Sequence, residues 1–103
     1  MKSIRSIIIR SFNQVTHLTL PCDSEIIKFD FVDGVSRIWY WYDSYASLEE
    51  RHVYIINDRT GVVENYELEY IGSSKDATEK MWHAFEILNY GSATEARLNI
   101  IKL

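Results

Sequence analysis

Apolar and polar residues alternate with a spacing of two along most of this chain. The alternation is clearest over residues 26–43, where two such runs flank Asp33 and Gly34. Asp-Gly is a preferred sequence for a two-residue type I′ turn, because both central residues of that turn need a positive φ. The pattern therefore predicts a β-hairpin here. Similar runs predict further strands at residues 4–9, 16–20, 51–57 and 66–70.

The register of the predicted hairpin separates its side chains into two faces. The apolar face, which we expect in the core, carries Ile27, Phe29, Phe31, Ile38, Tyr40 and Tyr42. The opposite face carries Lys28, Asp30, Arg37, Trp39 and Trp41. We expect Asp30 to pair with Arg37, and Lys28 to lie over the ring of Trp39.

Other segments are less sharply defined. The runs at 4–9 and 16–20 are separated by a turn-like Asn13-Gln14, which would allow them to pair as a hairpin. Residues 72–76 have loop composition, and 80–88 fit helical and strand spacing equally well. Ser92 and Glu95 have the spacing of a capping box for a short helix, whereas 97–103 have the composition of a last strand.

These patterns predict an all-β fold with mainly antiparallel strands. We expect a small β-sandwich or barrel of about six to seven strands, with or without a short C-terminal helix. The 103 residues suit a single domain, with a β core at 1–90 and a C-terminal extension at 91–103. No apolar run approaches the roughly 20 residues that cross a bilayer, so we expect no membrane association.

Charge and cysteine content narrow the classes of partner. Eleven basic and fifteen acidic residues give a net charge of −4, which opposes binding to nucleic-acid phosphates. Cys22 is the single cysteine, so no internal disulfide can form and a reducing, cytoplasmic location is expected. Aromatic residues make up 14% of the chain, more than a core of this size is expected to hold.

Residues for catalysis or metal binding are sparse in the sequence. His17, His52 and His83 are far apart, and none has a second ligand at a spacing typical of metal sites. Each glycine stands alone, so there is no phosphate-binding loop. The sequence therefore predicts no catalytic residue, no metal ligand and no cofactor. His83 is the best of the weak candidates for a catalytic base.

Several short motifs occur in a fixed order along the chain. They are Leu18-Thr19-Leu20-Pro21, Ile26-Ile27, Asp33-Gly34, Ile38-Trp39, Asp43, Tyr70-Ile71-Gly72 and Trp82-His83-Ala84-Phe85-Glu86. In this order the chain resembles a family of small uncharacterised bacteriophage proteins. The resemblance implies a compact all-β fold, a strand at residues 82–86, a phage origin and expression in the cytoplasm of a bacterial host. Trp41 and the tail beyond Tyr90 depart from the family pattern.

The predicted function is that of a binding protein rather than an enzyme. Exposed aromatic and basic side chains on one face are typical of an interaction surface, unless a second layer of the same chain covers them. The predicted binding residues are Lys28, Arg37, Trp39, Trp41, Trp82 and His83. With the resemblance, they favour a phage protein that inhibits a host protein, including a component of bacterial defence.

Single-stranded nucleic-acid binding by the aromatic face is an alternative that the net charge opposes. Three further alternatives stay open. The first is sequestration of a small nucleotide-like ligand between aromatic rings, with Arg37 or Arg51 at its phosphate. The second is a small hydrolase that uses His83 or His52 with a nearby carboxylate. The third assigns the tryptophan-bearing face to the contact between copies of a homo-oligomer.

Overall fold

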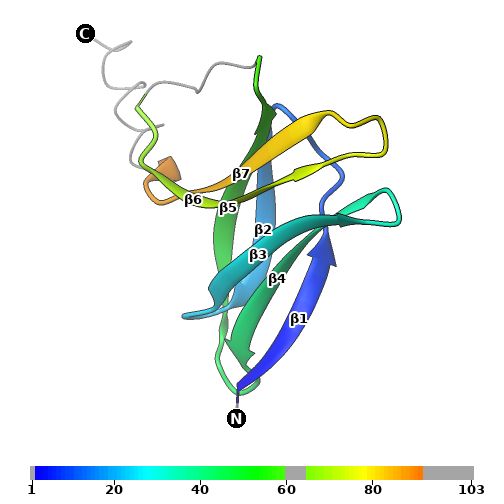
Figure 1. The fold of residues 1–103 in the computed structure, drawn as a ribbon. Helices are drawn as coiled ribbons and strands as arrows, with labels where there is room; N and C mark the ends of the chain where they lie inside the picture. Colours follow the sequence, from blue (N-terminus) through cyan, green and yellow to red (C-terminus); the bar gives the residue numbers. More distant parts are fainter. Residues whose placement is uncertain (1, 60–64, 92–103) are drawn as a thin grey trace, which may run out of the picture.

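The computed structural model describes residues 2–59 and 65–91. These residues form seven antiparallel strands in two sheets (Figure 1). The strands are β1 (Lys2–Ile8), β2 (Val15–Pro21), β3 (Glu25–Val32), β4 (Val35–Asp43), β5 (Leu48–Asn57), β6 (Leu68–Lys75) and β7 (Met81–Ile87). One sheet has the order β1-β4-β3 and the other β2-β5-β7-β6. The predicted all-β class is confirmed, and the arrangement is a small sandwich rather than a closed barrel.

The hairpin of β3 and β4 forms around the predicted turn. Asp33 and Gly34 have φ values of 52° and 78°, as a type I′ turn requires. The predicted register holds from the turn back to Lys28, where a bulge interrupts the pairing. As a result Ile26, not Ile27, opposes β4 and packs against the core, while Ile27 is exposed. The expectation that Ile27 faces the core is therefore wrong.

The first two strands do not pair with each other. β1 pairs with β4 and β2 pairs with β5, so the chain crosses from one sheet to the other between them. Ile9 is buried in this crossing, and its N–H donates to the carbonyl of Ser36 at 3.0 Å. Farther along, the N–H of Asn13 donates to the carbonyl of Ile55 at 2.7 Å. The predicted hairpin is wrong because these long-range contacts outweigh the local turn signal.

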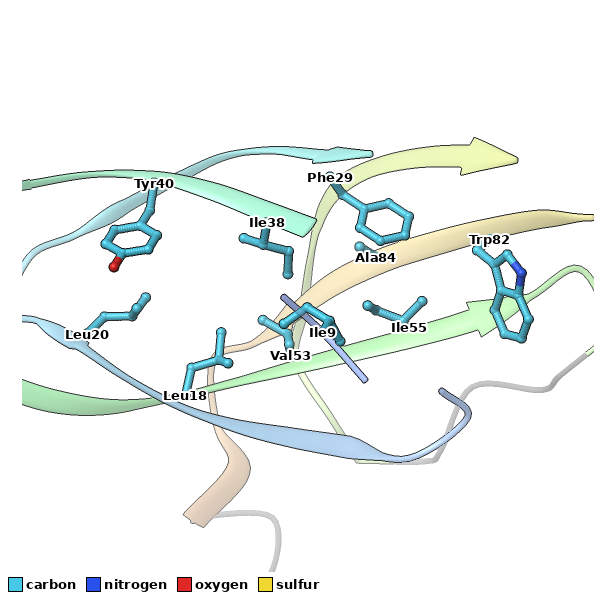
Figure 2. Packing of buried hydrophobic residues seen from close by; sticks show 10 residues of the cluster. All are labelled: Ile9, Leu18, Leu20, Phe29, Ile38, Tyr40, Val53, Ile55, Trp82 and Ala84. Carbon is cyan, nitrogen blue, oxygen red and sulfur yellow. The ribbon is translucent and has the colours of Figure 1, made fainter. Parts of the chain in front are cut away.

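The main core lies between the two sheets. Figure 2 shows Ile38 and Tyr40 pointing from β4 toward Leu18 and Leu20 of β2. The buried cluster consists of Ile9, Leu18, Leu20, Phe29, Ile38, Tyr40, Val53, Ile55, Trp82 and Ala84. At about 25 cal/mol per Å² of buried apolar surface, a cluster of this kind is the dominant favourable term in folding.

A second, smaller cluster covers the other face of the four-stranded sheet. Tyr54, Ile56 and Ile87 are buried there, under Tyr66 and Tyr90 among other residues. β5 therefore has apolar side chains on both of its faces, which explains the continuous run of apolar residues in the second half of this strand.

β6 and β7 resolve two uncertain segments of the sequence. β7 is a strand, as the resemblance implied for residues 82–86. β6 continues through Lys75, so the prediction of a loop over residues 72–76 is wrong for most of that segment. The hydroxyl of Ser74 donates to Asp30 Oδ1 at 2.6 Å and accepts from the N–H of Phe31 at 3.2 Å. These bonds hold β6 beside β3 and connect the two sheets.

The end of the described chain begins a helical turn at Tyr90 and Gly91. The helix and the last strand predicted beyond it fall on residues 92–103, which lie outside the described residues. No helix in the described part of the chain is long and apolar enough to cross a membrane.

Candidate functional site

The outer face of the three-stranded sheet exposes two indoles and two isoleucines. Ile4 of β1 opposes Trp41 of β4, and Lys28 of β3 opposes Trp39. Trp41 is 39% exposed, Ile4 50% and Ile27 39%, while Trp39 is half-buried. We call the five residues Ile4, Ile27, Lys28, Trp39 and Trp41 the tryptophan face. Residues 2–59 and 65–91 form two sheets and contribute no third layer over it.

The charged residues on the same side as the tryptophan face contact other residues of the chain. Lys28 Nζ lies 5.1 Å from the ring centroid of Trp39, which confirms the predicted contact, and 3.5 Å from Asp30 Oδ2. Asp30 and Arg37 are Cα partners, but the expected ion pair between them is wrong. Arg37 Nη1 instead donates to Ser6 Oγ at 3.1 Å.

The neighbouring β6 explains why Asp30 has a different partner. The Ser74 hydroxyl donates to this carboxylate and lowers the pKa of Asp30 below its usual value. The carboxylate of Asp30 also accepts from the N–H of Phe31. The packing of β6 beside β3, which the sequence does not reveal, decides this contact.

Trp82 lies in the core, away from the tryptophan face. It is 8% exposed, and its ring centroid is 4.8 Å from that of Phe12. Its indole N–H donates to Asp76 Oδ2 at 3.0 Å, and this bond contributes most to lowering the pKa of Asp76 to about 2. The structure therefore places Trp82 where it stabilises the end of the sandwich.

His83 is half-buried on the outer face of the other sheet. Its Nε2 forms a hydrogen bond with Asp58 Oδ1, and its ring lies 6.4 Å from that of Tyr70. Four of the six predicted binding residues thus share one face of the β1-β4-β3 sheet, namely Lys28, Arg37, Trp39 and Trp41. Trp82 and His83 belong to β7 in the other sheet.

Arg51, the second expected phosphate ligand, is already bound within the protein. Its Nε and Nη2 both donate to the carboxylate of Glu86, which is 8% exposed, and Nη1 donates to the carbonyl of Ser24 at 2.7 Å. The hydrogen bonds that Arg51 donates to Glu86 raise the pKa of Arg51 above its usual value. The guanidinium is therefore a structural link between strands.

A cleft of about 260 Å³ opens beside Trp41. Its charged lining residues are Lys2, Asp23, Glu25 and Asp43. Three carboxylates against one ammonium repel an anion, so this cleft does not favour the phosphate groups of a nucleotide.

The fold brings two of the three histidines together. His17 of β2 and His52 of β5 are direct Cα partners, and Glu50 lies two residues before His52 on the same face. Burial lowers the pKa of His52, and the neighbouring His17 lowers it further. Among the described residues, His17, Glu50 and His52 form a group that could hold a metal ion.

The sequence prediction did not bring these three residues together. It treated the histidines as isolated because His17 and His52 are 35 positions apart in the sequence. The alternation Glu50-x-His52 was the one available local signal, since residues two apart on a strand share a face.

Comparisons with protein-family models, with curated protein sequences and with solved structures find no match for this chain. The fold and its side-chain arrangement define the class as a small antiparallel β-sandwich. The resemblance to phage proteins stays a prediction.

Proposed function

We propose that this chain is a non-enzymatic binding protein whose tryptophan face docks onto a partner protein. The observation that carries the proposal is Trp41, exposed on a sheet face beside its cross-strand partner Ile4 and two residues from the partly covered Trp39. Tryptophan is the residue type most enriched among those that dominate binding energy at protein interfaces. A flat sheet face with exposed apolar side chains is typical of such contacts.

Charge favours a protein as the occupant of this face. The cations Lys28 and Arg37 alternate with the anions Glu25 and Asp30 on the same side of the sheet. A surface on which the two signs balance gives no net attraction for a polyphosphate backbone but suits the polar rim of a protein interface. The net charge of −4 acts in the same direction.

The alternative of a hydrolase has one supporting contact, the hydrogen bond between His83 and Asp58. A carboxylate can orient an imidazole for catalysis, but the imidazole must then also reach a nucleophile or a water. Among the described residues, no Ser, Thr or Cys side chain hydrogen-bonds to the ring of His83. The exposed side chains therefore support a binding function better than a catalytic one.

The resemblance stated above gives the partner that we propose. It is a bacterial host protein, inhibited in the host cytoplasm by a phage-encoded binder, and a defence component is one such target. The complementary surface would be apolar at its centre, to cover Trp41 and Ile4, with carboxylates placed near Lys28.

The proposal is tested by comparing capture from bacterial lysate by matched variants. Trp39→Ala and Trp41→Ala alter the tryptophan face. Tyr70→Ala is the control, because this residue is 55% exposed on the other sheet. We expect the wild type and the Tyr70 variant to capture the same host protein. Once purified, this host protein should bind the Trp41 variant at least about tenfold more weakly than it binds the wild type.

Two results would contradict the proposal. One is a host protein that binds all variants equally, which places its contact elsewhere. The other is a dimer that Trp41→Ala dissociates in size-exclusion chromatography with light scattering. That result would assign the tryptophan face to a second copy of this chain.

A further inference from the structure

Three ligand-type atoms converge on the outer face of the four-stranded sheet, on the side of the sandwich opposite the tryptophan face. His17 Nδ1 lies 3.1 Å from Glu50 Oε1, and His52 Nε2 lies 3.7 Å from the same oxygen. One ligand atom from each of the three residues lies within 4.8 Å of the other two. Two neighbouring strands, β2 and β5, hold the group together through their backbone pairing.

The spacing suits a small divalent ion. A tetrahedral zinc ion binds nitrogen and oxygen ligands at about 2.0 to 2.2 Å, which puts neighbouring ligand atoms about 3.4 Å apart. The separations of 3.1 and 3.7 Å lie on either side of this value, and the third pair of ligand atoms lies within 4.8 Å. The Glu50 side chain is 63% exposed, so it is free of packing that would hold its carboxylate in one orientation.

We propose that His17, Glu50 and His52 form a binding site for a divalent transition metal ion of the zinc class. Two imidazoles and one carboxylate are ligands that such ions accept, whereas Mg²⁺ and Ca²⁺ take mainly oxygen ligands. Three protein ligands leave a fourth coordination position for water or for a group of another molecule.

The surroundings keep the two imidazoles in place. The ring of Tyr90 stacks on that of His52, with centroids 4.4 Å apart and planes inclined by 26°. The same tyrosine meets His17 edge-on, with ring centroids 5.4 Å apart. Arg51 lies between Glu50 and His52 in the sequence and therefore on the opposite face of the strand, and its guanidinium is bound to Glu86 and Glu49, which reduces its repulsion of a cation.

The site has a structural consequence for β2. This strand is an edge of its sheet and pairs with β5 alone among the described strands. An ion bound by His17 and by two residues of β5 would add a cross-strand link at this edge. Metal binding would then stabilise the folded chain by mass action.

The experiment is a titration of the full chain with Zn²⁺ alone, followed by isothermal calorimetry, and with Co²⁺, followed by visible absorption. His17→Ala, His52→Ala and Glu50→Gln each remove one ligand. His83→Ala is the matched control, since it removes an imidazole that is paired with Asp58 instead. Near-UV circular dichroism checks that each variant is folded, and Glu50→Gln changes a side chain that is 63% exposed.

We expect one ion per chain, a ligand-field spectrum of tetrahedral Co²⁺, and at least about a tenfold loss of affinity in each of the three ligand variants. The His83 variant should bind as the wild type does. The proposal is overturned if the wild type does not bind, or if His83→Ala weakens binding as much as the ligand variants. It is also overturned if any folded ligand variant retains the wild-type affinity.

Discussion

Asp76 gathers four hydrogen-bond donors in the turn between β6 and β7. Its Oδ1 accepts from the N–H and the hydroxyl of Thr78 and from the N–H of Lys80, and its Oδ2 accepts from the indole of Trp82. A carboxylate is better suited to this role than an amide, because both of its oxygens accept. One residue therefore shapes the turn and fixes the ring of Trp82 at the end of the core.

The pKa of Asp76 predicts how stability responds to acid. Folding lowers this pKa from 3.8 to about 2, so the folded state favours the charged form. The stabilisation is complete above about pH 4 and is lost as the pH falls toward 2. We expect Asp76→Ala to lower the thermal unfolding midpoint at pH 7, and to flatten the decline of stability between pH 4 and 2. Thermal unfolding followed across this range measures both effects.

A suitable control for this measurement is Glu67→Gln, which neutralises an exposed carboxylate at another site. It should leave both the midpoint at pH 7 and the acid response close to those of the wild type. An Asp76 variant with the same acid response as the wild type would show that these hydrogen bonds do not hold the carboxylate in its charged form.

At the scale of single elements, the hairpin of β3 and β4 depends on the backbone of Gly34. Its φ of +78° is unfavourable for residues with a Cβ atom, although no other atom lies within 4 Å of the place that a Cβ would occupy. Gly34→Ala should therefore destabilise the protein by backbone strain alone, by about 1 to 2 kcal/mol. Urea unfolding gives this value, and Gly91→Ala, at an equally open position without positive φ, should show no such loss.

The ion pair of Arg51 and Glu86 joins β5 to β7 and to the carbonyl of Ser24. Arg51→Met would leave the nearly buried carboxylate of Glu86 without its partner. We expect this to lower the free energy of unfolding by about 3 kcal/mol. The double variant Arg51→Met, Glu86→Leu removes both charges and should recover much of that loss. Urea unfolding of the two single variants and the double variant measures the coupling, and equal losses in the single and double variants would count against it.

Local patterns predicted most of the strands, but they left residues 80–88 undecided between helix and strand, and non-local pairing decided how the strands are arranged. The turn at Asp33 and Gly34 fixes its own register, so the hairpin followed from the sequence. The partners of β1 and β2 did not, because Ile9 is buried between sheets by residues far along the chain. The same limit applies to the candidate sites. The Lys28–Trp39 contact lies within the hairpin, whereas His17 and His52 meet only through the pairing of β2 and β5.

At the scale of the whole molecule, the two sheets separate the two proposed sites. The tryptophan face lies on the outside of β1-β4-β3, and the imidazoles of His17 and His52 lie on the outside of β2-β5-β7-β6. The core of the sandwich fills the space between them, and packed sheets are about 10 Å apart.

This separation predicts that the two sites act independently. Substitutions without shared contacts normally have additive effects, to within about 0.5 kcal/mol. We therefore expect Trp41→Ala to leave the affinity for Zn²⁺ unchanged, and His52→Ala to leave capture of the host protein unchanged. Calorimetry with Zn²⁺ and affinity measurements with the captured protein, on both single variants and the double variant, test this. A change of more than about threefold at the distant site would show that the sandwich couples its two outer faces, because a shift of that size exceeds the additivity limit.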